Sequence, residues 1–250
     1  DTVKAQTPEL EAAMLADFGK PAAETYMTEI GLVLAELRDQ LRHVRRWSRP
    51  RRVPTPLMHF PASSYISPEP YGVVLIMAPW NYPIQLCLAP LAGAIAAGNC
   101  AIVKPSAYAP HASRAIRAVI EAAFPAEHAA VIEGGRAENQ ALLHERFDYI
   151  FFTGSSAVGK QVMQAAAEYP EIQFCHATGF QAASSGLANM HNYFTSIYEA
   201  RYVSGVVAGL KLNAMIADGT ITEDTCKIGY VGAFPYAEVI SGYTSFFLGA

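Results

Sequence analysis

Two segments of the sequence carry polar side chains directly after apolar runs. Asn81 stands in the segment PWNYP, just after the first of these runs. A side-chain amide there can donate a hydrogen bond to a developing oxyanion, although an Asn at the end of a strand is also a common turn former. Lys104 and Ser106 follow the second run, and their ammonium and hydroxyl groups could bind ribose hydroxyls or phosphate. Both segments predict polar groups at the ends of strands.

A third segment, FTGSSAVG, has the order of strand, turn and helix that suits a phosphate-binding loop. Gly154 lets the backbone approach a ligand closely, Ser155 can cap the following helix, and the helix N-terminus attracts a pyrophosphate. Gly154 and Gly159 are spaced G-x-x-x-x-G, so the usual dinucleotide fingerprint is absent. Gln161 stands where a Walker loop needs Ser or Thr. Taken alone, each of the three segments is a modest signal.

Strands that alternate with helices must position these residues. Continuous apolar runs are typical of parallel strands that are covered on both faces. We expect strands at 73–77, 101–103, 129–132 and 149–152, and helices at 83–97, 112–123, 139–144 and from the turn at 153–155 to 167. This alternation predicts an α/β fold with a doubly wound, Rossmann-like parallel sheet and flanking helices. Before it, residues 9–47 have helical periodicity with a break at Pro21, and the prolines between 50 and 61 predict an extended connection.

The overall composition excludes several classes of protein. The chain has 250 residues, 52% hydrophobic and 16% charged, which excludes disorder. A net charge of −4 gives no bulk attraction to nucleic acid or anionic lipid, and we interpret the arginines between 42 and 52 as a solvated helix end or a subunit contact, as in a homo-oligomer. The sequence has neither an apolar run long enough for a membrane span nor the layout of a signal peptide. Four cysteines without a C-x-x-C pair predict no metal site and suit the cytoplasm.

The composition changes after Glu168. The first 168 residues hold fifteen of the eighteen Lys and Arg and fourteen of the sixteen prolines. The last 82 residues hold three basic residues and two prolines, yet they carry thirteen of the twenty-seven aromatic residues. A shift of this kind marks a candidate domain boundary, although domains of one protein can differ this much.

Taken together, the segments of the first part are specific. The order PEPYGVVLIMAPWNYP, AAGNCAIVKPS and FDYIFFTGSSAVGK resembles the aldehyde dehydrogenase superfamily, in particular its shorter, class-3-like members. The resemblance runs from the first residue to about 167. It implies a bound NAD or NADP as the small-molecule partner. It also implies roles for nine residues: Asn81 as the oxyanion-hole amide, Ala78, Pro79 and Trp80 beside the nicotinamide, Lys104 and Ser106 at the adenosine ribose, Gly154 and Ser155 at the pyrophosphate, and Val158 beneath the adenine.

One departure from the family pattern affects cofactor choice. The family often has Glu after Lys-Pro-Ser, where the carboxylate binds both ribose hydroxyls, but this sequence has Ala107. Without that carboxylate there is no repulsion against a 2′-phosphate, so we expect NADP to be accepted as well as NAD.

A second departure concerns catalysis. Aldehyde oxidation in this family needs a cysteine thiolate as nucleophile and a glutamate that activates water. The family's segment E-L-G-G-K-S-P is missing, and His176 falls at the position of its Glu; the later G-Q-x-C motif is also missing. None of the four cysteines, Cys87, Cys100, Cys175 and Cys226, has surroundings that predict a nucleophile. We therefore predict an inactive chain, and two interpretations stay open: an aldehyde dehydrogenase by its larger segment, or a non-catalytic dinucleotide or purine-nucleoside binding module.

The second part of the chain has a different resemblance. Three blocks between 169 and 250, at 169–180, 198–209 and 227–240, resemble the basic-membrane-protein family of purine-nucleoside-binding lipoproteins, whose members are membrane-anchored. We expect strands at 172–174 and 227–231 and helices at 193–210 and 237–248, a βαβα fragment of periplasmic-binding-protein type. Phe180, Phe234 and Glu238 could line a pocket or pack at turns and helix starts. The sequence thus predicts a chimera of two domains, 1–168 and 169–250.

Overall fold

The structure, a computed structural model, describes residues 1–250 except 155, 178–181, 194–195 and 233–236. It divides into two compact units, Asp1–Tyr193 and Phe194–Ala250. The first unit contains all three segments predicted to do chemistry. The sequence-based boundary after Glu168 lies earlier than the structural division, because two further strands join the sheet of the first unit.

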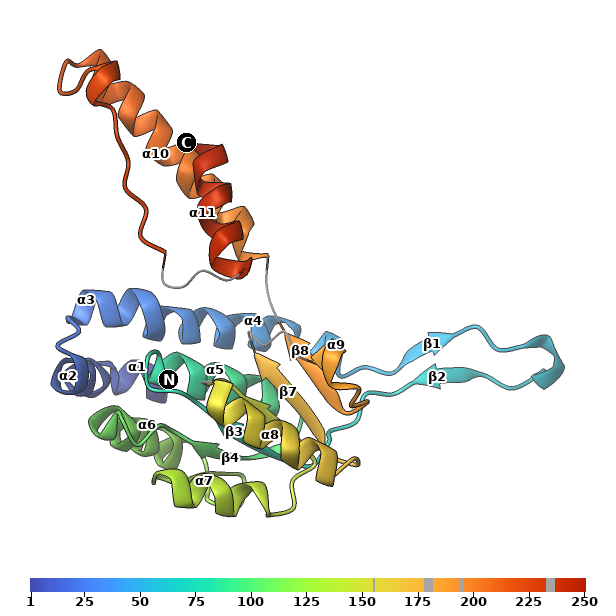
Figure 1. The fold of residues 1–250 in the computed structure, drawn as a ribbon. Helices are drawn as coiled ribbons and strands as arrows, with labels where there is room; N and C mark the ends of the chain where they lie inside the picture. The colour runs from blue at the N-terminus through green and yellow to red at the C-terminus, as the bar shows by residue number, and fades with distance from the viewer. Residues whose placement is uncertain (155, 178–181, 194–195, 233–236) are drawn as a thin grey trace. The chain divides into compact units, whose positions relative to one another are not determined.

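Six parallel strands form the sheet of the first unit, in the order β5-β4-β3-β6-β7-β8 (Figure 1). The strands are β3 Val73–Met77, β4 Cys100–Lys104, β5 Ala129–Val131, β6 Tyr149–Phe152, β7 Gln173–Ala177 and β8 Met190–Tyr193. The chain begins in the middle of the sheet, adds β4 and β5 on one side, and then crosses to add β6, β7 and β8 on the other. The direction of winding therefore reverses between β3 and β6, as the predicted doubly wound sheet requires.

Helices cover both faces of this sheet. On β3, Val74 and Ile76 belong to one buried cluster and Leu75 and Met77 to another, because successive side chains of a strand point to opposite faces. The first cluster includes residues of α2, α4, α5 and α6, and the second includes residues of α7 and α8. The helices of this unit are α1 Thr2–Ala5, α2 Thr7–Phe18, α3 Ala22–Thr25, α4 Gly31–Trp47, α5 Pro83–Ala96, α6 Pro110–Ala123, α7 Arg136–Leu143, α8 Ser156–Glu168 and α9 Ala182–Ser185, with a π-helical turn at Tyr26–Ile30.

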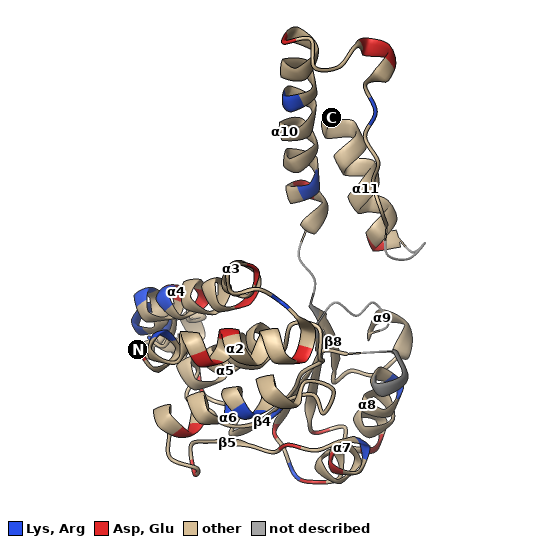
Figure 2. Ribbon diagram, turned by 90° about the vertical axis from the view of Figure 1, so that its left-hand side faces the viewer, with Lys and Arg blue, Asp and Glu red and all other residues tan. Residues whose placement is uncertain are grey.

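The connection after α4 is more regular than the sequence predicts. It forms an antiparallel ribbon of β1 Arg51–Val53 and β2 Ser64–Ile66, with a short 3-10 turn at Leu57–His59, and this ribbon projects from the body of the unit (Figure 1). Lys and Arg gather at the end of α4 (Figure 2), where cations interact favourably with the helix dipole. The predicted helix break at Pro21 is confirmed, since α2 ends at Phe18 and Gly19 adopts a φ of +66°.

The second unit differs from the prediction. Its helices are α10 Ile197–Ala217 and α11 Ala237–Gly249, with a 3-10 turn at Glu223–Thr225 between them. The predicted helix at 237–248 is confirmed, but the predicted strand at 227–231 is wrong, because these residues have no regular structure. Val231 is 96% exposed, and among the residues that the structure describes no strand pairs with 227–231. The predicted βαβα order is therefore replaced by β7, α9 and β8 in the sheet, followed by two helices.

Within the described ranges, no helix is both long and apolar enough to cross a bilayer. The four cysteines form no disulfide.

Candidate functional site

The loops after β3, β4 and β6 begin at the carboxyl ends of these strands, next to the point where the direction of winding reverses. Met77 at the end of β3 is in register with Lys104 on one side and with Phe152 on the other. The backbone continues this alignment for one more step, since the Ala78 N–H donates to the Lys104 carbonyl (3.1 Å) and the Thr153 N–H donates to the Met77 carbonyl (3.0 Å). Ligands of open α/β sheets bind in the crevice at this place.

Lys104 is the most constrained polar side chain of the crevice. It is 3% exposed, and its Nζ donates to the carbonyls of Pro105 (2.9 Å) and Gly134 (2.6 Å). Burial lowers the pKa of the ammonium, and the charge of nearby Glu138 opposes this shift. An ammonium has three N–H donors, so one remains without a partner among the described residues. That donor can serve a ligand oxygen.

The loop with Gly134 shapes the floor beneath Lys104. Gly134 has a φ of +139°, a region that favours glycine, and a Cβ there would collide with the Glu138 side chain. Glu138 in turn accepts the Gly135 N–H at 2.6 Å and caps α7. Hydrogen bonding to its own backbone and to that of Gly135 lowers the pKa of the Glu138 carboxyl. This loop is not among the predicted site segments, and the pair Gly134-Gly135 shortly after β5 was the signal available in the sequence.

The loop after β3 presents its side chains outward. Trp80 is 52% exposed and lies with its ring centroid 6.1 Å from that of Phe18, while Ala78 and Pro79 are half-buried. The Asn81 side chain is exposed and makes no hydrogen bond within the part of the chain that the structure describes. An amide in this state is free to donate to a ligand. Pro83 then begins α5, a position that suits its fixed φ.

The loop after β4 continues from Lys104 through Ser106, which is half-buried. The Ser106 Oγ accepts the Tyr108 N–H at 3.3 Å, and its carbonyl accepts the Ser113 hydroxyl at 2.9 Å. Ala107 is exposed, so a larger side chain at this position has room.

The turn after β6 brings backbone close to the crevice. A Cβ on Gly154 would lie 2.7 Å from the Phe152 ring, so only glycine fits without a shift. Helix α8 begins directly afterwards, at Ser156, and a helix N-terminus favours anionic ligands. Ser155 and the Val158 side chain lie outside the described residues.

The residues weighed as nucleophile or base are dispersed. Cys87 is buried in α5, and burial raises the pKa of its thiol far above the usual range, so it is not a thiolate at neutral pH. Cys100 is the first residue of β4, so it lies at the amino-terminal ends of the strands, away from the crevice. Cys226 belongs to the second unit. Cys175 and His176 both lie in β7, in register with Phe151 and Phe152. The His176 ring centroid lies 5.2 Å from that of Phe152, and burial lowers the pKa of His176.

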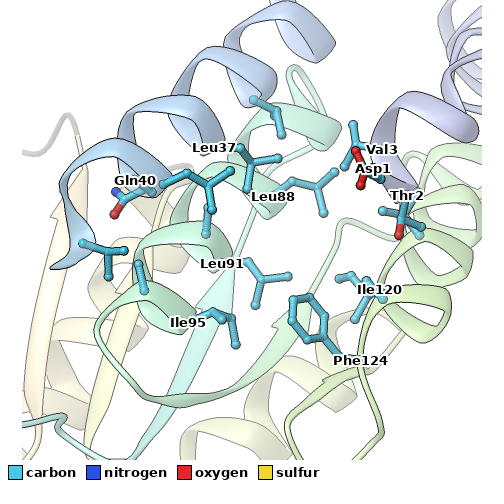
Figure 3. A pocket seen from close by; sticks show the side chains of 17 residues that line it. Asp1, Thr2, Val3, Leu37, Gln40, Leu88, Leu91, Ile95, Ile120 and Phe124 are labelled. Carbon is cyan, nitrogen blue, oxygen red and sulfur yellow. The ribbon is translucent and has the colours of Figure 1, made fainter.

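An apolar pocket of about 310 Å³ lies elsewhere in this unit, between α1, α4, α5 and α6 (Figure 3). Leu37, Leu91 and Phe124 are among its lining residues, and the described residues around it include none of those predicted to bind a cofactor. No cluster of His, Cys, Asp and Glu that could hold a metal ion occurs among the described residues.

The parallel sheet with reversed winding order and helices on both faces defines a Rossmann-like α/β protein. The model of the aldehyde dehydrogenase family matches residues 1–177, and the chain belongs to this family.

Known relatives agree with this assignment. The 4,4′-diaponeurosporen-aldehyde dehydrogenase of Staphylococcus aureus is 49% identical over 166 residues, which cover 66% of this chain and 36% of that protein. Aldehyde dehydrogenase family 3 member B1 of Homo sapiens is 44% identical over 160 residues, covering 64% and 34%. The structure of Staphylococcus aureus AldH in a substrate-bound state superposes with a TM-score of 0.69 at 46% identity, over 71% of this chain and 39% of that one. The chain thus spans about a third of the length of the curated relatives it matches.

Proposed function

We propose that the crevice between β3 and β6 binds NAD or NADP, as the cofactor-binding part of an NAD(P)-dependent aldehyde dehydrogenase. The observation that carries this proposal is the buried Lys104 ammonium, which is held by two carbonyls and keeps one donor for a ribose hydroxyl. Ser106 assists at the ribose, and the turn at Gly154 and Ser155 receives the pyrophosphate at the start of α8. The family resemblance assigns Val158 to the adenine.

The other end of the cofactor reaches the loop after β3. Ala78, Pro79 and Trp80 form the wall beside the nicotinamide, and the Asn81 amide donates to the oxyanion that forms when an aldehyde is attacked. The exposed, unbonded state of Asn81 supports this role, because the amide need not break a protein hydrogen bond first.

A titration of the 250-residue chain with NAD and NADP tests the cofactor site. Lys104→Met keeps most of the buried volume but removes the ammonium, and loss of one hydrogen bond from a charged donor weakens binding about tenfold to a hundredfold. Lys4→Met, at an exposed position of α1, is the matched control and leaves the affinity unchanged. Equal binding by wild type and Lys104→Met, or no binding by the wild type, would refute the proposal.

We also propose that this chain does not oxidise aldehydes, since it supplies neither a thiolate in the crevice nor a general-base glutamate. Incubation with a reactive aldehyde and NAD or NADP should give no absorbance of reduced nicotinamide. A rate above that of a variant with all four cysteines replaced by serine would contradict this.

The last part of the chain supports a second candidate. We propose that the chain beyond the family match, which extends to residue 177 and so past the predicted boundary after Glu168, has an origin outside the aldehyde dehydrogenase family and derives from a purine-nucleoside-binding protein. The change of composition after Glu168, the end of the family match at residue 177 and the separate compactness of Phe194–Ala250 support a chimera. Titration with guanosine tests it: binding that Lys104→Met leaves intact would locate a nucleoside site outside the cofactor crevice, and absence of binding would leave the nucleoside role without support.

A further inference from the structure

A buried carboxylate lies behind the loop that carries Trp80 and Asn81. Glu29, in the π-helical turn before α4, is fully buried. Its Oε1 accepts the Lys20 ammonium at 2.8 Å, and its Oε2 accepts the N–H groups of Ile84 (2.8 Å) and Gln85 (3.4 Å). A buried charge is tolerated only when it is paired and hydrogen-bonded, and Glu29 meets both conditions.

This carboxylate takes the place of a missing helix cap. Tyr82 precedes α5 and provides no side-chain hydrogen bond to the free N–H groups of the first turn. Glu29, 55 residues earlier in the chain, satisfies them instead and also places a negative charge at the positive end of the helix dipole. Any motion of α5 away from Glu29 would leave a buried charge with too few partners.

Lys20 extends the contact to the loop itself. Its Nζ lies 4.9 Å from the centroid of the Tyr82 ring, so one cation neutralises Glu29 and also contacts the last residue of the loop. The loop consists of residues 79–82, between the hydrogen bond of Ala78 with Lys104 and the first turn of α5. It is therefore fixed at one end by the sheet and at the other by the pair of Glu29 and Lys20.

The next helix along the sheet is held in the same way. Asp17, at the end of α2, has a side chain that is 3% exposed, and its Oδ2 accepts the Ala112 N–H at 2.8 Å in the first turn of α6. Its Oδ1 contacts His111 Nδ1 at 2.7 Å. The N-terminal helical segment thus supplies buried carboxylates to α5 and α6, two of the helices that begin at the crevice. This repetition argues that these contacts help to set the shape of the crevice.

We propose that Glu29 is a positioning residue, with Lys20 as its counterion, that sets the conformation of the Trp80–Asn81 loop. This proposal rests on the proposed function in one respect only: the loop is taken to contact the nicotinamide half of NAD(P). The conformation of the loop can be measured without any ligand, so the two ideas fail separately.

The test uses the full chain with 5-fluorotryptophan in a Trp47→Phe background, which leaves Trp80 as the single tryptophan and one fluorine resonance. Glu29→Gln and Lys20→Met should shift or split this resonance, while Lys20→Arg, which keeps the cation, should not. Asp148→Asn is the matched control, because the Asp148 carboxylate accepts the Val73 N–H (2.8 Å) at the opposite end of β3. It should leave the resonance unchanged.

A second measurement separates positioning from general loss of structure. Glu29→Gln should weaken binding of NAD about fivefold, the effect of one ordinary hydrogen bond, and leave binding of AMP unchanged, since AMP lacks the nicotinamide half. A folded Glu29→Gln or Lys20→Met protein with the wild-type resonance would overturn the proposal, as would an equal change in Asp148→Asn. Should Glu29→Gln not fold, Lys20→Met decides alone. If the wild type binds no NAD but the resonance responds as expected, the proposed function falls and the positioning role stands.

Discussion

Asn189 joins the last two strands of the sheet to the rest of the first unit. The residue is 5% exposed, and its Nδ2 donates to the carbonyls of Ala166 (2.9 Å), Tyr169 (3.1 Å) and Ile172 (2.9 Å). These carbonyls belong to the end of α8 and to the connection into β7. Asn189 itself lies beyond the segment that matches the family, so Asn189→Ala tests whether the later residues stabilise the family fold.

The loss of stability expected for Asn189→Ala follows from the number of hydrogen bonds that its amide can donate. An amide group has two hydrogens, so three carbonyls share two donors, and the substitution removes about two hydrogen bonds. Each hydrogen bond contributes about 1 kcal/mol, and a buried carbonyl left without a donor costs about 1 kcal/mol more. The free energy of unfolding should therefore fall by about 3 kcal/mol. For a unit of this size, that corresponds to a fall in Tm of about 9 °C.

Both tryptophans, Trp47 and Trp80, lie in the first unit, so urea unfolding followed by tryptophan fluorescence reports this unit alone. Asn81→Ala is the control, since that side chain is exposed, and its effect should stay within about 0.5 kcal/mol. A change below about 0.5 kcal/mol for Asn189→Ala would refute the reasoning, because the segment before β8 would then not be packed against α8 in solution.

Three further outcomes are expected. Ala107→Glu restores a carboxylate near the ribose, so the Kd for NADP should rise at least about tenfold relative to that for NAD; an unchanged ratio would place the 2′-phosphate elsewhere. Gly205→Ala puts a Cβ against the Phe246 carbonyl, so it should lower the thermal midpoint of the α10–α11 pair seen by circular dichroism while the tryptophan signal stays unchanged; Gly229→Ala, which meets no atom within 4 Å, is its control. The folded-state pKa of His176 is lowered by burial, so the unfolded chain takes up a proton first as the pH falls through about 6.5, and stability is lost. Between about pH 7 and pH 5 the wild type should therefore lose stability more steeply than His176→Gln, and parallel curves would contradict this.

The centre of the sheet could be predicted from the sequence because its strands are continuous apolar runs. The expected strand at 149–152 coincides with β6, and the expected strand at 101–103 lies within β4 Cys100–Lys104. The strand expected at 227–231 does not form. This segment, KIGYV, includes Lys227 and Gly229 and is not a continuous apolar run, and in the part of the chain that the structure describes no strand pairs with it. The ribbon of β1 and β2 was missed because its three-residue strands, RRV and SYI, are too short to show a period.

The crevice was predictable only in part. Lys104 ends β4, and Ser106 and Gly154 lie two residues beyond β4 and β6, so their place at the carboxyl edge follows from the order of elements alone. Glu29 and Asp17 could not be found in this way, because their partners lie 55 and 95 residues away along the chain and local spacing holds no trace of such contacts. In the sequence, Glu29 belongs to a helical segment and has no other distinguishing sign.

The strand order has a consequence for how the protein can change. Each new strand, in order of synthesis, adds to an outer edge of the sheet and never inserts between strands that are already paired. The strands after β6 therefore meet established structure on one side only, and β8 ends the sheet. Evolution or engineering can therefore replace β7 and β8 without disturbing the pairing of β3 with β4 and β6. A recombination point after β6 is accordingly one that the strand order of this sheet permits.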